Sequence, residues 1–401
     1  METSAETTLP RTIPRGVWVL GFVSLFMDAS SELVHSLLPV FMVSALGASA
    51  LAVGLVEGVA EATALIVKVF SGALSDYLGR RKELTAFGYG LGALSKPLFA
   101  VAGTVDGVLT ARFIDRIGKG MRGAPRDALV ADLTPEAVRG AAYGLRQSLD
   151  TVGAFLGPVL AMALMILFAG NFRKVFWFAV IPGALSVVLL LAGVREPEAS
   201  KRPRTAESPV RWRMLKRFDR AYWLVVAVGT VFTLARFSEA FLILRARQLG
   251  LSDALVPAVL VLMNVVYAAT AYPAGRLADR LDRRILLAAG LIVLLLSDLA
   301  LARAEGLALA AVGVALWGLH MGLTQGLLAA MVAAAAPPQL RGSAFGFFNL
   351  AGGCAILAAS ALAGLLWDKA GAPATFYAGA AFSAAALMLL AANLSGDGQK
   401  I

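Results

Sequence analysis

The chain has little charge and a single cysteine. Only 15% of its 401 residues are charged, against about 25% in an average soluble domain, and its mean hydropathy is +0.76. These values exclude an ordinary soluble protein and indicate an integral membrane protein. The lone cysteine, Cys354, excludes an intrachain disulfide framework and a cysteine-rich metal site.

The sequence also lacks the motifs of the common enzyme classes. It contains no phosphate-binding loop, no clustered nucleophile and no dedicated catalytic metal motif. We therefore expect no enzymatic activity, no bound cofactor and no nucleotide-driven pumping. The leader METSAETTLPRTIPRG has no pattern of a cleavable signal, and we expect neither it nor the short tail to add a signalling domain.

Apolar segments of about 20 residues recur along the chain, which is the length that a helix needs to cross the hydrocarbon core of a membrane. The ten-residue alternation of a membrane barrel is not found. The predicted fold class is all-α integral membrane, with twelve spans in two six-helix bundles. The expected parts are a leader (1–15), an N-terminal bundle (16–194), a linker (195–220), a C-terminal bundle (221–393) and a tail (394–401). Among the spans, continuous helices are predicted at about 16–46, 221–247 and 306–335.

The net charge of +10 is also found in nucleic-acid-binding proteins, but here the basic residues gather in alternate loops. They concentrate at 80–82, 201–217 and 280–284, while the intervening loops hold few. Basic loops stay in the cytoplasm, so the charge predicts topology and no nucleic-acid partner. We expect a multi-pass protein of a bacterial-type inner membrane with both termini in the cytoplasm.

One predicted span carries a stripe of charges. In RFIDRIGKGMRGAPRDALVAD (112–132), helical periodicity places six charged residues within about 120° of one another; they are Arg112, Asp115, Arg116, Lys119, Arg122 and Arg126. Charges at membrane depth usually face a bundle interior or a water-filled cavity, so the stripe indicates a transport pathway. The alternative is a solvated face or an early exit from the membrane, because three glycines and Pro125 weaken the helix here.

Other spans offer charges that balance this stripe. Asp28, Glu32 and His35 share one face of the first predicted helix, and Glu57 and Glu61 share one face of the second. With Lys68, Arg146 and Asp150 included, the presumed inward faces of the N-terminal half sum to zero, or to +1 with Lys96. Mutual pairing would lower the cost of burying them, so the stripe does not define the sign of the substrate. Arg126 and Asp127 are expected at a cytoplasmic gate near Asp76.

Three roles remain open for these groups. Asp28, Glu32, Glu57 and Glu61 are candidates for proton coupling, because burial favours a neutral carboxyl and a nearby cation favours a charged one. Asp28, Glu32 and His35 are weaker candidates for a divalent metal site. The third role is a structural salt-bridge network. The full set of candidate cavity residues is His35, Arg112, Asp115, Arg116, Lys119, Arg122, Arg146, Asp150, Arg236, Glu239, His320 and Gln325.

The two halves of the chain repeat. GALSDYLGRR (72–81) matches GRLADRLDRR (275–284) at an offset of 203 between Asp76 and Asp279, and RGAAYG (139–144) matches RGSAFG (341–346) at an offset of 202. Two landmarks that agree to one residue predict parallel halves related by an axis along the membrane normal.

These motifs resemble the major facilitator superfamily of secondary transporters. Its loop pattern Gly-x-x-x-Asp-x-x-Gly-Arg-Arg is matched by Gly72, Asp76, Gly79, Arg80 and Arg81. The resemblance implies that these residues, with Asp279 in the second copy, act in gating. The second copy departs from the pattern because Asp282 replaces a glycine.

Residues 140–168 are similar to the glycine-proline motif of the superfamily's drug:proton antiporters. Gly144, Gly153, Gly157 and Pro158 have the spacing, but 159–162 lack the closing glycines. Close helix packing through small residues is an equal explanation.

We therefore expect a proton-coupled secondary transporter, with export favoured, that carries a small organic molecule by alternating access. The alternatives are efflux of a divalent metal ion by the acid/His face, and transport of an organic anion by the basic face of residues 112–126. The expected partners are the lipid bilayer, protons and the substrate, and the protein is expected to be a monomer.

Overall fold

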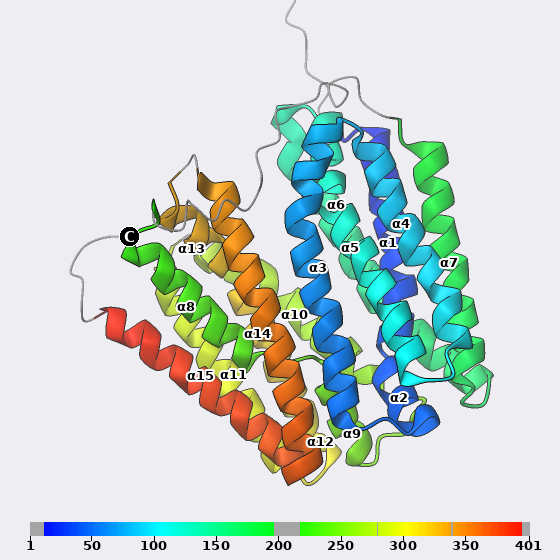
Figure 1. The fold of residues 1–401 in the computed structure, drawn as a ribbon, viewed down its shortest axis with the longest axis vertical. Coiled ribbons are helices and arrows are strands. Elements are labelled where there is room, and N and C mark those ends of the chain that lie inside the picture. Colours follow the sequence, from blue (N-terminus) through cyan, green and yellow to red (C-terminus); the bar gives the residue numbers. More distant parts are fainter. Residues whose placement is uncertain (1–11, 196–216, 279, 338–339, 395–401) are drawn as a thin grey trace, which may run out of the picture.

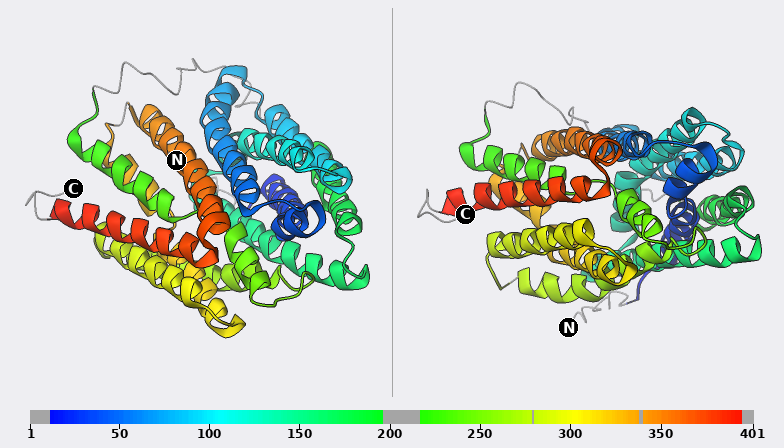
Figure 2. Two further views of the ribbon diagram at one scale, coloured as in Figure 1. Left: turned by 60° about the horizontal axis from the view of Figure 1, so that its bottom comes forward. Right: turned by 90° about the horizontal axis from the view of Figure 1, so that it is seen from below.

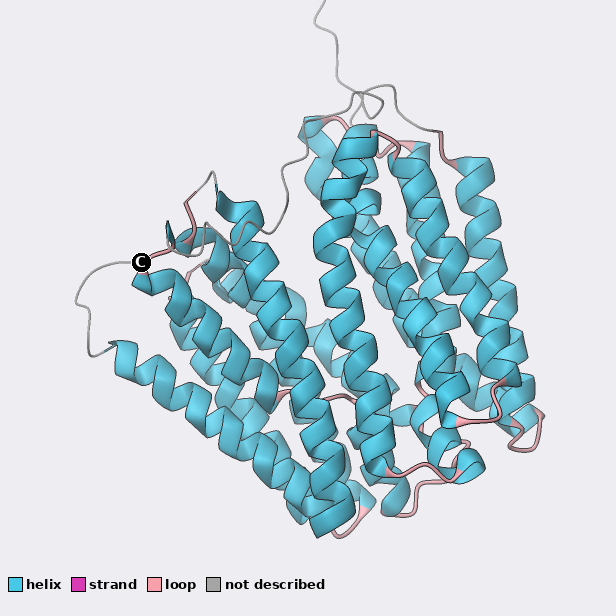
Figure 3. Cartoon of the chain, in the orientation of Figure 1, coloured by secondary structure: helices cyan, strands magenta, loops and turns pink. Residues whose placement is uncertain are grey.

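The computed structural model describes residues 12–195, 217–278, 280–337 and 340–394, and within these ranges it contains helices and no strand (Figure 3). The helices are α1 (Arg15–His35), α2 (Leu38–Leu46), α3 (Ala50–Leu78), α4 (Arg81–Val101), α5 (Val105–Leu133), the short 3-10 helix η1 (Glu136–Val138), α6 (Arg139–Leu167), α7 (Phe172–Gly193), α8 (Arg220–Ala235), α9 (Ala240–Gln248), α10 (Ala258–Ala278), α11 (Arg283–Arg303), α12 (Leu307–Thr324), α13 (Leu327–Ala335), α14 (Arg341–Ala370) and α15 (Ala372–Leu394). The predicted linker and tail fall almost wholly outside the described residues.

Twelve membrane crossings result, because α1 with α2, α8 with α9 and α12 with α13 each form one path. Ten of the twelve are long and apolar enough to cross a membrane by length and composition. The other two are α4 and α5, whose 21 and 29 residues are long enough but carry many charges. The predicted all-helical fold with twelve spans is confirmed.

Three helices predicted as continuous are broken in the structure. The first breaks at Ser36–Leu37, and Pro39 lies at the start of α2, where proline is favoured. The second breaks at residues 236–239, between α8 and α9. The third breaks at Gln325 and Gly326, and Gly326 adopts a φ of 72° that suits glycine. Interrupted helices typically line binding sites in secondary transporters.

The stripe-bearing helix, in contrast, is not weakened by its glycines. α5 runs without a break, and the glycines bring its backbone against its neighbours. A Cβ on Gly118 would lie 2.6 Å from the carbonyl oxygen of Gly88 in α4, and one on Gly120 would lie 2.9 Å from that of Ala64 in α3. The expectation of a weakened helix was wrong, because small residues here serve close helix packing.

The helices form two bundles, α1–α7 and α8–α15, which lie side by side (Figure 1). Between the bundles, α3 packs along α14, α6 packs against α10, and α2 packs against α9. The blue-to-green and green-to-red halves remain distinct when the molecule is turned (Figure 2). The basic loop between α3 and α4 lies at one end, at the top of Figure 1, and this end is called the basic-loop end below.

The bundles are joined at the end opposite the basic loops. One apolar cluster there includes Phe41 and Phe176 of the first bundle and Phe241 and Trp317 of the second. Toward the basic-loop end, each bundle has apolar clusters of its own. The halves therefore share a core at one end and separate at the other.

A hydrogen-bonded contact crosses the joined end. The carboxylate of Asp368 in α14 accepts from the backbone N–H groups of Ala50 (3.0 Å) and Leu51 (2.9 Å) at the start of α3. Close approach of the two helices allows this, since a Cβ on Gly364 would lie 2.4 Å from the carbonyl oxygen of Ala50. Asp368 thus caps a helix of the other half.

Candidate functional site

A cavity lies between the two bundles and runs from the helix breaks toward the basic-loop end. One part has a volume of about 410 Å³ and is lined by α1, α3, α5, α6 and, from the second bundle, α10. A second part of about 350 Å³ reaches the α8–α9 break. The two parts share Glu32, Glu61, Leu65 and Lys119, so they form one pathway.

The walls of this cavity differ in chemistry. In the larger part the first bundle contributes five acidic and four basic side chains, which are Asp28, Glu32, Glu61, Asp127, Asp150, Lys68, Lys119, Arg122 and Arg126. The second bundle contributes Asn264 and Tyr267 there, and Phe232 and Phe237 in the smaller part. A charged wall of nearly balanced sign therefore faces a polar and aromatic wall, which carries one ion pair of its own, Arg236 with Glu239, in the smaller part.

The stripe of α5 is paired with the carboxylates of α1 and α3, as the charge balance predicted. Arg112 donates to Glu57 at 2.6 Å, and Arg116 lies 3.3 Å from Glu61. Arg122 lies 3.9 Å from Asp28. Asp115 of the stripe accepts instead from Lys96 of α4, at 2.7 Å.

These carboxylates differ in how far they reach the cavity. The Glu57 side chain is 1% exposed, whereas those of Glu32, Asp28 and Glu61 are 21%, 26% and 36% exposed. A buried ion pair depends strongly on both partners, while a partly hydrated carboxylate can exchange protons with water. The geometry separates Glu57, which is sequestered, from the other three.

Arg126 and Asp127 do not lie at a gate with Asp76, contrary to expectation. The guanidinium of Arg126 donates to Ser24 Oγ at 3.0 Å and lies 3.7 Å from Asp150, and both residues line the cavity. Asp76 pairs instead with Arg81 at 3.0 Å. Pro125 does not interrupt α5, so the stripe continues and carries Arg126 toward α1 and α6.

Most of the predicted cavity residues line the cavity. Those that do are His35, Arg116, Lys119, Arg122, Asp150, Arg236 and Glu239, together with the carboxylates of α1 and α3. Arg112 and Asp115 are buried behind the wall in ion pairs, and Arg146 pairs with Asp150 at the margin. His320 is buried inside the second bundle. Gln325 accepts a hydrogen bond from Tyr267 at 2.6 Å without lining the cavity itself.

The proposed metal trio does not converge. His35 Nδ1 lies 3.1 Å from Glu32 and its Nε2 lies 3.5 Å from Glu57, while Asp28 faces Arg122. Among the residues that the structure describes, no group of three or more His, Cys, Asp or Glu side chains is arranged to hold a metal ion. Both ring nitrogens of His35 therefore lie next to carboxylates, and this face of α1 belongs to an ionic network.

The gating loop between α3 and α4 is held by charges of the same bundle. Gly79, with a φ of 62°, ends α3, and Gly72 packs near Ala124 of α5. Arg81 bonds to both Asp76 and Asp132, while Arg80 pairs on the surface with Glu83 at 3.2 Å. Asp76 thus pairs within its own bundle, and its gating role stays a prediction.

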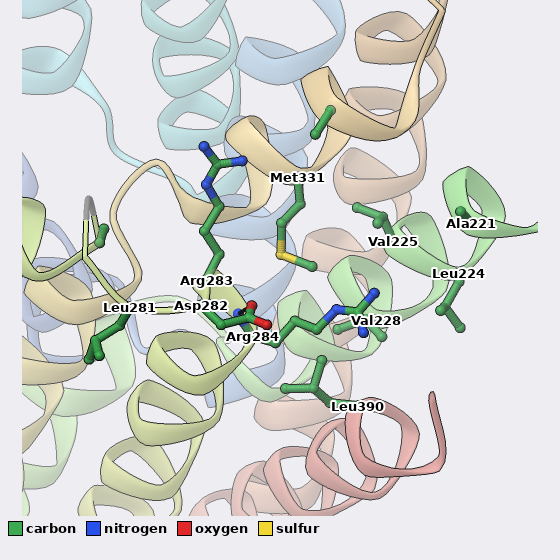
Figure 4. A pocket seen from close by; sticks show the side chains of 12 residues that line it. Ala221, Leu224, Val225, Val228, Leu281, Asp282, Arg283, Arg284, Met331 and Leu390 are labelled. Atoms are coloured by element: carbon green, nitrogen blue, oxygen red, sulfur yellow. Dashed lines mark hydrogen bonds between the residues drawn. The ribbon is translucent and has the colours of Figure 1, made fainter. Parts of the chain in front are cut away.

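The second copy of this loop borders a separate cavity. Asp279 lies outside the described residues, but Asp282, Arg283 and Arg284 line a space of about 400 Å³ with aliphatic side chains such as Val228 and Leu390 (Figure 4). This space lies within the second bundle and holds none of the predicted cavity residues. It is not part of the pathway between the halves.

The glycine motif of α6 packs against the acidic face of α1. A Cβ on Gly153 would lie 2.4 Å from the carbonyl oxygen of Leu25, and one on Gly157 would lie 2.7 Å from Cβ of Glu32. Gly144 has open space around it. Two of the three glycines thus serve close packing, which also fixes the backbone that bears Asp28 and Glu32.

Several residues of the site were not singled out from the sequence. Tyr89 of α4 bonds to Ser24 at 3.0 Å and lies under the guanidinium of Arg122, 4.9 Å from the ring centre. Asn264 of α10 lines the cavity. Neither side chain is unusual in its own segment, and their roles depend on contacts between distant helices.

Comparison with known proteins agrees with this architecture. The chain is 30% identical over 364 residues to an uncharacterised MFS-type transporter of Methanocaldococcus jannaschii, with 89% of each chain covered. It is 26% identical over 184 residues, 46% of each chain, to the quinolone resistance protein NorA of Staphylococcus aureus. The crystal structure of a D-xylose–proton symporter superposes with a TM-score of 0.73 at 16% identity, covering 93% of this chain and 96% of the other.

The family model described as Major Facilitator Superfamily matches residues 20–252 and 227–398. These matches cover nearly the whole chain and both bundles. The chain belongs to the major facilitator superfamily of transporters.

Proposed function

We propose that this protein is a proton-coupled secondary transporter that exports a small organic molecule by alternating access. The observation that carries the proposal is the cavity between the bundles, where three partly exposed carboxylates line one wall. Binding at the midplane between two repeats, followed by rocking of the halves, is the general design of such transporters.

The cavity supports an organic cargo of modest size. Its two parts, of about 410 and 350 Å³, fall within the range of roughly 300–1,000 Å³ that is common for small-molecule sites. The aromatic side chains Phe232 and Phe237 suit an apolar part of the molecule. The wall of mixed charge suits a cargo with groups of either sign, so neither a metal ion nor a simple organic anion is favoured.

The coupling role falls to Asp28, Glu32 and Glu61. Each is partly exposed to the cavity and each faces a cation of the stripe or, for Glu32, His35. A proton that displaces such a cation changes the ion pairs between α1, α3 and α5, which biases the equilibrium between two arrangements of the bundles. Glu57 holds Arg112 and has a structural role in this scheme.

The positive-inside rule places the end with the basic loops in the cytoplasm, so the cavity would face the cytoplasm of an inner membrane, with both termini on that side. Importers and exporters both expose such a cavity to each side in turn, so export is supported by the similarity to the resistance protein NorA. Cargo would enter from the cytoplasm and leave when the joined end opens.

The test uses purified protein in liposomes with an internal pH indicator and a fluorescent fluoroquinolone as the probe. A pH gradient should drive probe accumulation, and the probe should evoke proton flux. Asp28→Asn and Glu32→Gln should abolish the coupled flux while retaining exchange of the probe without a gradient. Asp106→Asn, an exposed carboxylate at the start of α5, is the matched control. Unaltered coupling in both cavity variants would refute the coupling role.

A further inference from the structure

The second bundle buries a carboxylate that has no partner. Asp298 of α11 is 0% exposed, and neither of its oxygens has a hydrogen bond or ion pair within the described ranges. Charged groups inside a membrane bundle are otherwise paired. Burying a lone carboxylate costs several kcal/mol, so Asp298 holds a proton in this conformation.

The internal repeat shows what occupies the same place in the first bundle. The offset of 202 residues that relates the halves links Asp298 to Lys96 and Trp317 to Asp115. Lys96 and Asp115 form an ion pair at 2.7 Å. A glycine packs beside Lys96 of α4 and another beside Asp298 of α11. A Cβ on Gly183 would lie 3.6 Å from Cγ of Lys96, and one on Gly379 would lie 2.6 Å from Oδ2 of Asp298.

The second bundle thus has no ion pair at the corresponding positions. They hold the carboxyl of Asp298 and the indole of Trp317, whose Nε1–H is itself buried without an acceptor. One helical turn further along α12, His320 directs Nδ1 to the carbonyl oxygen of Gly290 at 2.9 Å and leaves Nε2 unpartnered. An indole N–H is a donor only, so it is suited to receive the carboxylate when the proton leaves.

The ring of Phe237 lies between Asp298 and the cavity, on the route that a proton would take. Phe237 lines the cavity, packs on Trp317 with ring centres 5.4 Å apart, and would lie 2.9 Å from a Cβ on Gly379, beside Oδ2 of Asp298. Phe237 belongs to the non-helical break between α8 and α9. Movement of this break would therefore open or close access to the carboxyl.

Other charged groups near this part of α11 are engaged elsewhere. Arg245 of α9 donates to the carbonyl oxygens of Leu301 and Ala304 at the end of α11. Arg236 and Glu239 lie 3.9 Å apart and line the cavity. α15, which packs against α11, buries the hydroxyl of Ser383 without a partner among the described residues. Among the residues that the structure describes, no cation is therefore positioned to neutralise Asp298.

We infer that Asp298 is a second proton-binding site of this transporter, sealed in the present conformation by Phe237 and Trp317. The site takes one proton from water when the joined end opens, and it returns that proton to water in the cavity when the α8–α9 break moves. This inference rests on the proposed proton coupling, and it adds a carrier in the second bundle to those in the first.

The first test needs no substrate. Infrared spectra of the purified protein at neutral pH should contain a protonated-carboxyl band that Asp298→Asn removes and Asp28→Asn retains. Trp317→Phe removes the indole donor, so the band should persist to higher pH than in the wild type. A spectrum that is the same in wild type and Asp298→Asn would overturn the site.

The second test measures coupling in liposomes with the fluoroquinolone probe and the membrane potential clamped at zero. Each coupled proton sustains a roughly tenfold probe gradient per pH unit. Across one pH unit, Asp298→Asn, with one coupled proton fewer, should therefore reach a gradient about tenfold smaller than that of wild type. A variant gradient equal to that of wild type would overturn the coupling role of Asp298. Absence of any gradient with wild type would instead refute the proposed function for this probe, while the infrared result would still decide the proton site.

Discussion

Replacing Glu57 by glutamine should destabilise the protein far more than the same change at Glu61. Glu57 and Arg112 are both 1% exposed and lie 2.6 Å apart, so the change removes the close partner of a buried guanidinium and leaves it only Asp115, at 3.9 Å. Removing one member of a buried pair costs about 3–5 kcal/mol. Glu61 lies 3.3 Å from Arg116, but its side chain is 36% exposed, and the buried Arg116 keeps a second carboxylate, Asp115, at 3.7 Å. We therefore expect a smaller loss at Glu61.

The measurement is equilibrium unfolding of the two variants in one detergent, with Glu61→Gln as the control one helical turn away. A double variant, Glu57→Leu with Arg112→Leu, should recover most of the stability lost in Glu57→Gln, because it removes the unpaired charge together with its partner. Equal losses in the two single variants, or no recovery in the double variant, would refute the argument that the interior of this bundle is dry and ion-paired.

The remaining predictions concern packing and the joined end. Gly153→Ala should cost about 1–3 kcal/mol in unfolding experiments through overpacking, because its Cβ would lie 2.4 Å from a carbonyl oxygen, whereas Gly144→Ala, with open space, should be near neutral; similar losses would contradict the packing account. Cysteines at Ser44 and Asp253, whose side chains are 3.2 Å apart, should cross-link under oxidation in a background without the natural cysteine and stop probe transport; transport by the cross-linked protein would contradict alternating access. Asp368→Asn, added to the two-cysteine variant, should lower the yield of that cross-link, since it weakens the cap that joins the halves. An unchanged yield would show that the cap is not needed for closure.

The overall fold follows from features that are local in the sequence. Apolar runs, basic loops and the repeat offset determine the number of spans and the parallel halves. The pairing of α5 with α1 and α3 was also predictable, because helical periodicity places its charges on one face and the carboxylates of two other spans balance them. Charge neutrality inside a membrane bundle then requires that they meet.

The helix breaks and the second bundle's buried carboxylate were not predicted, for different reasons. Ser36 and Leu37 are not helix breakers by themselves, and the usable signal for this break was Pro39, which cannot donate a hydrogen bond to the carbonyl oxygen four residues earlier. Asp298 was visible as a single charge in an apolar span, but it has no charged neighbour in the sequence and no periodic partner. Its interest comes from the absence of contacts, which only the folded structure reveals.

The cap that Asp368 places on α3 has a consequence for the resting balance of the transporter. Two backbone N–H groups bond to this carboxylate, and an N-terminal cap contributes typically about 1 kcal/mol. If both bonds are lost when the joined end opens, a stabilisation of one to two kcal/mol weights the populations by a factor of roughly 5–30. A single carboxylate far from the cargo would then determine which fraction of the unloaded protein has its joined end closed and its cavity open at the end of the basic loops.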